Sequence, residues 1–562
     1  MSKEKAGGYI SKITFNDGKQ VDVAANDIVV FVGANNAGKS QALRDIYALS
    51  EKKVPTVVIS DIEIRKSAAL LSTALSNLSI GDNRGNYTVY NVLGHGMSLC
   101  DAEEKAFPTE KYFGEYRDLF VANLDTSARL TICRPPRSVR RDGVKEHPIH
   151  YAVTDSGYRK WLSDSFKKAF GVEIMPNILF GAEVPLCIGE PVQLSDEYPD
   201  EQSRQEAYAG ILETYKQVHY QGDGIKSFTG ILLYLMLDYY RIYLIDEPES
   251  FLHPPQARIM GQIIGQTLSV QQQAFISTHS EDVIKGLLEV CPDRIKIIRI
   301  TREDDTNQFS VLNNNEFSQV WNDPLLKYSN IMTSLFHKSV VLCESDSDCK
   351  LYSIIESHIK KKEQKYSETL FIHCGGKHRM AKIIEALRSL DINVKVIADI
   401  DVLNDEEVFK KIVESFGLGF SSVQKDYKVL VSNLHSPKEK VNRNSAKVAI
   451  NQVLDSGKET ELSRREIKDI REVISTVSKW DGIKAAGVTA LPAGDATTSF
   501  RALDQILRGS GIYIVPVGEL ECFIKEVGGH GPEWVNKVLE MYPDLDDDVY
   551  KDIVTFVASI NM

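Results

Sequence analysis

Short apolar runs that stop at glycine or at a polar residue recur along the first half of the chain. Ile28–Val32 predicts a buried strand, and Gln41–Leu49, which follows a glycine-rich turn, has the pattern of a helix. Ile242–Ile245 and Ala274–Ser277 predict two further strands, and the apolar segment Thr229–Tyr239 predicts a helix before the first of them. The pattern therefore favours an α/β domain.

The turn between the first strand and its helix fits G-x-x-x-x-G-K-[ST]. In a strand–loop–helix context, such a turn predicts a phosphate site, because glycine lets the backbone wrap closely and the amides face negative charge. Lys39 would reach phosphate oxygens, and Ser40 would ligate Mg²⁺. A chance lysine in a glycine-rich turn is the alternative, which the flanking pattern disfavours. The predicted nucleotide-binding residues are Gly33, Asn35, Asn36, Ala37, Gly38, Lys39, Ser40 and Gln41.

Two acidic residues end the strand at 242–245. Asp246 suits a Mg²⁺ shell, and Glu247, one residue further, suits activation of an attacking water. His279 follows the next strand and could sense a γ-phosphate. A lone histidine is usually structural, but this one follows the other motifs in order.

A second glycine-rich turn, Gly222-Asp223-Gly224-Ile225-Lys226-Ser227, stands immediately before the predicted helix at 229–239. It could be only a helix cap. Together with the phosphate loop, Asp246-Glu247 and His279, however, it resembles the signature of ABC-type ATPases of the SMC and RecF sort. That resemblance implies that Gly222, Gly224 and Ser227 contact the nucleotide of a partner subunit in a head-to-head homodimer. The common form is Ser-Gly-Gly, from which this turn departs.

Length and composition limit the remaining possibilities. A chain of 562 residues predicts two to four domains, and its net charge of −12 requires any DNA contact to be local. The eight cysteines include no C-x-x-C pair, which indicates reduced thiols and no zinc site. The longest apolar run, Ile231–Ile245, contains Asp238 and Arg241, so no membrane span is expected. Without a signal segment at the N-terminus, we expect a cytoplasmic protein.

The second half repeats the alternation of strand and helix with different chemistry. Predicted strands at 339–343, 369–374, 394–398 and 511–517 imply a parallel sheet with its site at the strand ends. Asp399 and Asp401 are two residues apart, so in an extended chain both face the same way. Carboxylates at one sheet edge form a hard-oxygen site for Mg²⁺ or Mn²⁺. The predicted metal ligands are Glu344, Asp348, Asp399 and Asp401, with Glu519 and Glu521 as candidates for a second metal position.

This arrangement, with Gly375-Gly376 after the second strand, resembles a TOPRIM domain. The usual glycine after the glutamate is Ser345 here. We expect an ATPase domain over 1–335 with a mixed insertion or dimerisation region at 51–215. The TOPRIM domain is expected over 336–562 with a helical insertion at 432–505.

Two basic segments are candidate DNA contacts, although most such segments are only solvated. The first is the loop Arg134–Arg141. The second is the helical insertion, with Lys438, Lys440, Arg443, Lys447, Arg464 and Arg465.

An ABC-type ATPase followed by a TOPRIM domain resembles the OLD (overcoming lysogenisation defect) family. The resemblance implies an ATP-regulated, metal-dependent DNA endonuclease, often an effector of bacterial anti-phage defence with partner proteins or RNA. A primase of this class usually carries a zinc module, and a topoisomerase needs a separate DNA-gate domain. The sequence indicates neither, which favours a nuclease. Glu344, Asp399, Asp401, Glu247 and His279 are the expected catalytic residues. The alternative is an ATP-switched DNA clamp or scaffold whose TOPRIM domain serves a partner.

Overall fold

The computed structural model describes residues 6–312 and 331–560, apart from 94, 141–142, 180, 191, 193, 195–197, 304–305, 435–442, 457–460, 464–465, 468, 471–472 and 474–478. The chain divides into two compact units, residues 1–321 and 322–562. Of the predicted basic residues, Arg141, Lys438, Lys440, Arg464 and Arg465 lie outside the described residues.

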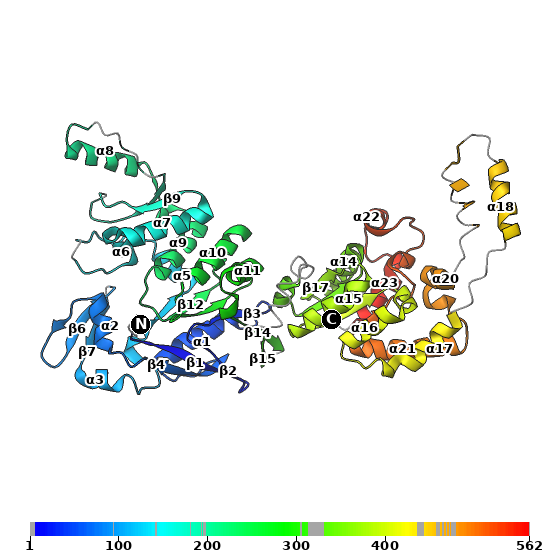
Figure 1. Cartoon of the computed structure of the whole chain (residues 1–562), viewed down its shortest axis with the longest axis horizontal. Coiled ribbons are helices and arrows are strands. Elements are labelled where there is room, and N and C mark those ends of the chain that lie inside the picture. Colours follow the sequence, from blue (N-terminus) through cyan, green and yellow to red (C-terminus); the bar gives the residue numbers. More distant parts are fainter. Residues whose placement is uncertain are drawn as a thin grey trace. The chain divides into compact units, whose positions relative to one another are not determined.

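A six-stranded sheet forms the centre of the first unit (Figure 1). Its strand order is β15-β14-β3-β13-β12-β8, and all neighbours are parallel except β15, which runs antiparallel to β14. All five residues of β3 are buried, as expected for a strand that is covered on both faces. The strands are β3 (Ile28–Val32), β8 (Val121–Leu124), β12 (Ile242–Asp246), β13 (Gln273–Ser277), β14 (Ile295–Glu303) and β15 (Thr306–Val311).

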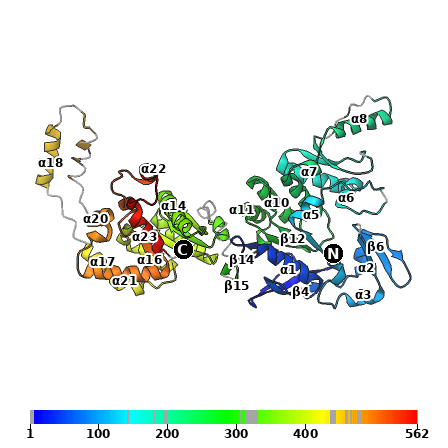
Figure 2. The ribbon, with the colours of Figure 1, turned by 180° about the vertical axis from the view of Figure 1, so that it is seen from behind.

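Helices cover both faces of this sheet. One face packs on α1, whose buried residues Ala42, Leu43, Ile46 and Leu49 recur at helical spacing. Helices α10 and α11 lie on the opposite side from α1 in both views (Figures 1 and 2). The helices of this unit are α1 (Lys39–Glu51), α2 (Leu71–Leu78), α3 (Asp101–Ala106), α4 (Arg117–Phe120), α5 (Thr126–Thr131), α6 (Pro148–Thr154), α7 (Ser156–Phe170), α8 (Glu201–Glu213), α9 (Asp223–Leu235), α10 (Pro254–Thr267) and α11 (Glu281–Val290).

Part of the region 51–215, which we expected to be one insertion, belongs to the ATPase fold. β4 (Ile59–Lys66) pairs with β1 (Gly8–Phe15), and β8 forms an edge of the six-stranded sheet beside β12. The prediction missed these strands because they pair with distant segments of the chain. A strand of four residues, such as β8, is too short for its periodicity to indicate that pairing. The small three-stranded sheets are β2-β1-β4, β5-β6-β7 and β11-β10-β9, with β2 (Gln20–Asp22), β5 (Asp82–Asn83), β6 (Thr88–Val92), β7 (His95–Leu99), β9 (Glu173–Pro176), β10 (Leu186–Gly189) and β11 (Lys216–Gln217).

The second unit contains a four-stranded parallel sheet of order β17-β16-β18-β19. Its strands are β16 (Ser339–Cys343), β17 (Thr369–His373), β18 (Asn393–Ala398) and β19 (Ile512–Ile514). One buried cluster joins this sheet to α14, α22 and α23, with Trp534 and Tyr352 among its largest side chains. The helices are α14 (Asp346–Lys362), α15 (Met380–Ser389), α16 (Glu406–Ser415), α17 (Ser421–Leu434), α18 (Arg443–Ser456), α20 (Lys479–Ala486), α21 (Asp495–Ser510), α22 (Gly531–Met541) and α23 (Lys551–Ser559). The described residues of the region 432–505 are therefore mainly helical.

Candidate functional sites

The glycine-rich turn after β3 folds around its own lysine. Gly33 has φ 142°, and a Cβ there would lie 2.0 Å from the carbonyl oxygen of Ile300, so only glycine fits. Gly38, with φ 102°, caps the N-terminus of α1. The Lys39 ammonium donates to the carbonyl oxygens of Gly33 and Ala34 at 2.9 and 2.8 Å. Burial lowers the pKa of Lys39 to about 8, although nearby Glu247, Glu249 and Asp246 oppose the shift. An anion bound by the loop would favour the charged ammonium.

The other predicted loop residues differ in their surroundings. Asn35 and Asn36 are exposed, and Asn36 adopts a left-handed φ of 60°. Ala37 is buried, and its carbonyl oxygen accepts a bond from the Asn307 amide at 2.7 Å. Gln41 donates to Asp45 along α1 at 2.8 Å, so its side chain is already engaged with its own helix.

The carboxyl ends of β12 and β13 bring the next motif against this loop. The Ser40 hydroxyl donates to Asp246 Oδ1 at 2.7 Å, and Ser277 bonds the same oxygen. Ser40 and Asp246 therefore meet, as a shared Mg²⁺ site requires.

Glu247 and His279 are also brought together. His279 Nε2 lies 3.6 Å from Glu247 Oε1, and the backbone N–H of His279 donates to Glu249 Oε1 at 2.6 Å. Glu247 has a left-handed φ of 48°, a conformation that costs energy outside glycine and occurs often at functional sites. Burial and the nearby Lys39 charge lower the pKa of His279, while Glu247 and Asp246 oppose the shift.

A buried arginine completes this arrangement, and the sequence did not suggest it. Arg129, in α5 after β8, is 0% exposed and donates to the carbonyl oxygens of Asp246 and Glu247 at 2.6 and 3.2 Å. It therefore fixes the backbone that carries both carboxylates. Its only sequence signal is the strand followed by the helix cap Asp125, whose side chain accepts a bond from the Ala128 amide.

The buried position of Ser227 does not favour a direct contact with a partner's nucleotide, and that contact stays a prediction. The glycine-rich turn at 222–227 is the first turn of α9, and Ser227 lies on the inner side of that helix with 0% exposure. Gly224 packs against the backbone of Phe251, where a Cβ would lie 2.5 Å from the carbonyl oxygen. Gly222 and Asp223 are exposed, so these residues are the accessible part of the turn.

In the second unit, three of the predicted carboxylates follow strand ends. Glu344 follows β16 directly, Asp399 follows β18, and Glu519 lies beyond β19. Asp348 lies in the first turn of α14, where its Oδ2 accepts the Ser345 amide at 2.8 Å. The extended chain predicted for Asp399–Asp401 is wrong, because a 3-10 helix, Ile400–Asn404, begins directly after Asp399 and contains Asp401.

The fold nevertheless places these carboxylates within electrostatic range of one another. Burial raises the pKa of Asp399 well above its usual value, and the charges of Asp348, Glu344, Asp401 and Glu519 add to the rise. Burial also raises the pKa of Glu344, with Asp401 the next cause. Glu344 Oε2 and Asp401 Oδ1 are buried and accept no hydrogen bond from any described residue. Such a set of close, unsatisfied oxygens fits a hard divalent cation.

Two lysines that the sequence left without a role border this carboxylate cluster. Lys377 Nζ lies 3.1 Å from Asp401 Oδ2. Lys484 Nζ, on α20, lies 3.2 Å from Glu519 Oε2 and 3.9 Å from Asp401 Oδ2. Gly518 makes the second arrangement possible, because a Cβ there would lie 2.0 Å from the Lys484 carbonyl oxygen. Lys377 could have been found from its place after Gly375-Gly376, whereas Lys484 has no local signal.

A histidine extends the second candidate metal position. Ligand atoms of Glu519, Glu521 and His530 all lie within 4.8 Å of one another, and His530 Nδ1 is 3.2 Å from Glu521 Oε1. Glu521 also accepts the Gly531 amide at 2.8 Å. The sequence suggested the two glutamates but not the histidine.

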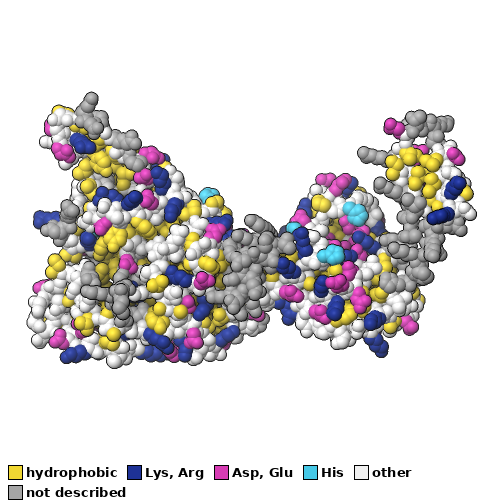
Figure 3. All heavy atoms as spheres, viewed as in Figure 1, with side chains coloured by type: hydrophobic (Ala, Val, Ile, Leu, Met, Phe, Trp, Pro, Cys, Tyr) yellow, Lys and Arg dark blue, Asp and Glu magenta, His cyan; other side chains and the backbone are white. Residues whose placement is uncertain are grey.

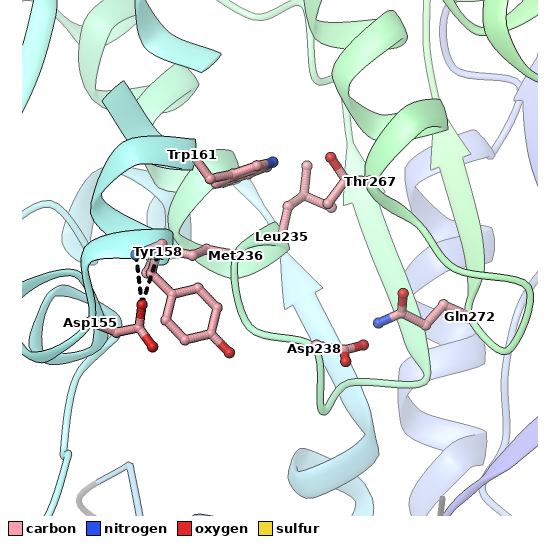
Figure 4. A pocket seen from close by; sticks show the side chains of 9 residues that line it. Asp155, Tyr158, Trp161, Leu235, Met236, Asp238, Thr267 and Gln272 are labelled. Carbon is pink, nitrogen blue, oxygen red and sulfur yellow. Dashed lines mark hydrogen bonds between the residues drawn. The ribbon is translucent and has the colours of Figure 1, made fainter. Parts of the chain in front are cut away.

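An open pocket of about 450 Å³ lies in the first unit, away from the predicted nucleotide residues (Figure 4). Trp161 and Tyr158 of α7 line it together with the ends of α9 and α10. Gln272, which also lines it, directly precedes β13, whereas His279 follows the opposite end of that strand. None of the residues predicted from the sequence lines this pocket.

Comparison with protein families finds a match for each unit. The model described as "Overcoming lysogenization defect protein-like, TOPRIM domain" matches residues 335–401. The model described as "AAA domain, putative AbiEii toxin, Type IV TA system" matches residues 193–284. The chain thus joins a P-loop ATPase domain to a C-terminal TOPRIM domain, and the predicted α/β fold class is confirmed.

One curated relative that the chain is similar to is the Old nuclease of Escherichia phage P2. The two are 23% identical over 169 residues, which is 29% of this chain and only 28% of that protein. With the two domain matches, this similarity supports the resemblance to OLD-family ATPase–TOPRIM proteins.

Solved structures with some similarity are SMC heads. The SmcHead bound to the C-winged helix domain of ScpA is 14% identical, with a TM-score of 0.35 over 55% of this chain and 99% of that one. The SMC head domain from Thermotoga maritima is 12% identical, with a TM-score of 0.29 over 55% of this chain and 100% of that one. The fold assignment rests on the sheet topology and family matches instead.

Two surface features bear on partners. Acidic and basic side chains are interspersed on the face shown in Figure 3, so positive charge is not gathered there into one broad patch. None of the described helices combines the length and hydropathy that a membrane span requires.

Proposed function

We propose that the chain is an ATP-regulated, divalent-metal-dependent DNA endonuclease. The similarity to a protein named Old nuclease supports the class of reaction. A role in anti-phage defence, with further protein or RNA partners, is the prediction that follows from the family resemblance.

The carboxylate cluster of the second unit is the observation that carries this proposal. Glu344, Asp348, Asp399 and Asp401 would hold a divalent cation, Mg²⁺ or Mn²⁺, and Glu519 and Glu521 would hold a second. Oxygen ligands suit both ions. The cations would supply positive charge to a phosphodiester during hydrolysis.

The chain's own groups would prepare the site for that charge. Burial of Asp399 and Glu344 withdraws their carboxylates from water, which strengthens electrostatic interactions in the site. Lys377 and Lys484 hold ammonium groups beside Asp401 and Glu519, where they would attract the DNA backbone.

In the first unit, the loop Gly33–Ser40 would hold the phosphates of ATP, and Ser40 with Asp246 would hold Mg²⁺. Glu247 would accept a proton from the attacking water. Its backbone is strained, and Arg129 fixes it by donating a hydrogen bond to the Glu247 carbonyl oxygen. His279 contacts Glu247 and would sense the γ-phosphate. Regulation would require two such heads to close as a homodimer, with Gly222 and Asp223 at the exposed turn.

Incubation of the purified chain with supercoiled plasmid tests the proposal. Cleavage is expected with Mg²⁺ or Mn²⁺ and not with EDTA, and ATP should change its rate. Glu344→Gln should abolish cleavage, whereas Glu540→Gln, on an exposed carboxylate of α22, should not. Nucleotide-dependent DNA binding without strand breaks under any metal condition would instead support a clamp or scaffold.

A further inference from the structure

A second pocket, in the ATPase unit, is lined by tyrosines and lies outside the predicted nucleotide site. Its volume is about 340 Å³, within the range of about 300–1,000 Å³ that is usual for small-ligand sites. We call it the tyrosine pocket. The residues that line it include Tyr47, Tyr234, Tyr239, Tyr240 and Asn123.

The aromatic rings form a preorganised apolar wall. Tyr239 and Tyr240 have ring centroids 4.3 Å apart, and Tyr234 and Tyr240 have centroids 6.1 Å apart. Tyr47 is held from outside, because its hydroxyl donates to Asp118 at 2.8 Å and the Arg117 guanidinium lies 3.9 Å from its ring. Flat aromatic surfaces of this kind favour a planar ligand that can stack.

Two polar groups of the pocket are available to a ligand. The Tyr239 hydroxyl is buried and interacts with the neighbouring Tyr240 hydroxyl, but it has no well-aligned hydrogen-bond partner among the described residues. The Asn123 side chain on β8 is half-buried and lines the pocket, so its carboxamide group can meet a ligand there. A buried hydroxyl with a poorly aligned partner loses part of its hydrogen-bond energy, so a ligand that bonds the Tyr239 hydroxyl would recover that part.

The charge of the lining excludes a phosphate group. No lysine or arginine lines the pocket, whereas the carboxylates of Asp118 and Glu146 do. Burial and the nearby His150 together lower the pKa of His147 to about 4, so this imidazole is neutral near pH 7. A phosphate would therefore meet negative charge with no counter-charge from the lining.

We propose that the tyrosine pocket binds a neutral planar heteroaromatic ligand, a purine base or nucleoside without phosphate. The rings would stack on the base, and the Asn123 amide can offer a donor and an acceptor to a purine edge, the pairing that asparagine makes with adenine. The Tyr239 hydroxyl would supply a further hydrogen bond.

The tyrosine pocket is separate from the predicted ATP site, but the helices α1 and α5 contribute to both. Tyr47 belongs to α1, which follows the phosphate loop, and Ile132 caps the end of α5, which carries Arg129. None of the residues from Gly33 to Ser40, nor Asp246 or Glu247, lines the tyrosine pocket. The proposal therefore stands independently of the nuclease and ATPase assignments.

Calorimetric titration of the full chain with adenosine, guanosine and AMP tests the proposal. A purine nucleoside is expected to bind saturably and AMP to bind at least about tenfold more weakly, because the pocket lacks a phosphate partner. Asn123→Leu should weaken nucleoside binding by about tenfold, since the leucine offers no hydrogen bond. Tyr239→Phe, which keeps the ring, should also weaken it, whereas Tyr366→Phe, on a tyrosine 93% exposed in the other unit, should not.

Lys39→Ala separates the tyrosine pocket from the phosphate loop. Nucleoside binding should persist in this variant, and its loss would overturn the proposal by assigning the signal to the ATP site. The proposal would also be overturned by the absence of saturable nucleoside binding to the wild type, or by unchanged affinity in folded Asn123→Leu and Tyr239→Phe variants.

Discussion

Replacement of Asp399 by asparagine should remove cleavage and at the same time stabilise the metal-free protein. Asp399 is buried among Asp348, Glu344, Asp401 and Glu519, whose charges oppose its ionisation. Asparagine keeps the shape of the side chain, removes its charge, and adds an amide that can donate to the neighbouring carboxylates. A residue chosen only for packing would instead lose stability when it is replaced.

The size of the effect follows from the charges. At an effective dielectric constant of about 20, two unit charges about 6 Å apart repel by about 3 kcal/mol. Lys377 and Lys484 offset part of this repulsion through Asp401 and Glu519. We therefore expect the free energy of unfolding to increase by about 1–2 kcal/mol, which raises Tm by roughly 2–8 °C for a domain of this size.

The raised pKa of Asp399 also determines how the stability of the metal-free protein depends on pH. A carboxyl group whose folded-state pKa is above its unfolded value, about 3.9 for aspartate, binds more protons when folded. Stability therefore falls as the pH rises from about 4 through the raised folded-state pKa of Asp399. In EDTA, the wild type should melt at a lower temperature at pH 8 than at pH 5, and Asp399→Asn should reduce this difference.

Calorimetry of both proteins in EDTA and in Mn²⁺ provides the measurement, read on the transition that Mn²⁺ shifts in the wild type. Asp552→Asn, on an exposed aspartate of α23, is the matched control and should leave both Tm and plasmid cleavage unchanged. An equal or lower Tm for Asp399→Asn in EDTA would refute the reasoning, as would normal cleavage by that variant.

Four further substitutions test the nucleotide site. Lys39→Ala should weaken ATP binding, whereas Glu247→Gln should retain binding and slow turnover, because an amide cannot accept the water's proton; equal loss of binding would give Glu247 another role. Arg129→Met should lower ATP turnover about tenfold or more, because it releases the carbonyls of Asp246 and Glu247. A steady-state phosphate assay measures this turnover, and Arg134→Met, at an exposed arginine, should leave it unchanged. Gly33→Ala should lose nucleotide binding, since its Cβ would meet the Ile300 carbonyl, whereas Gly18→Ala, with φ 85° but open space, should retain it by titration with labelled nucleotide.

The local pattern predicted those parts of the fold in which chain neighbours decide the structure. The strand Ile28–Val32 and its glycine-rich turn were predicted at the observed bounds, because five apolar residues, two glycines and a helical pattern lie in one continuous segment. The strand ends at Asp246 and Asp399 were found for the same reason.

The remaining features depend on contacts between distant segments. Arg129 lies 117 residues before Asp246, whose carbonyl it binds, and nothing in its neighbourhood marks it. Lys484 reaches Glu519 only because Gly518 lets α20 approach that loop closely. Asp401 has the predicted neighbours but a different backbone, because the chain turns into a 3-10 helix directly after Asp399.

The buried position of Ser227 decides how coupling between ATPase heads should be tested. An arginine at this position would place a charge inside the unit and would destabilise the fold, so its effect on regulation would have no clear meaning. Asp223 is exposed and forms a 2.8 Å pair with Lys226 within one helical turn, an interaction worth only about 0.2–0.5 kcal/mol.

Asp223→Arg is therefore the sharper variant for the proposed head-to-head homodimer. If the exposed turn closes over a partner's nucleotide, the larger side chain should block ATP turnover and remove the nucleotide dependence of cleavage, with nucleotide binding by one subunit intact. A ligand shifts the balance between open and closed heads only by its differential affinity for them. Asp82→Arg, which also removes an exposed local ion pair, should behave as the wild type. If ATP changes the cleavage rate of Asp223→Arg by as much as that of the wild type, the two domains are not coupled through this turn.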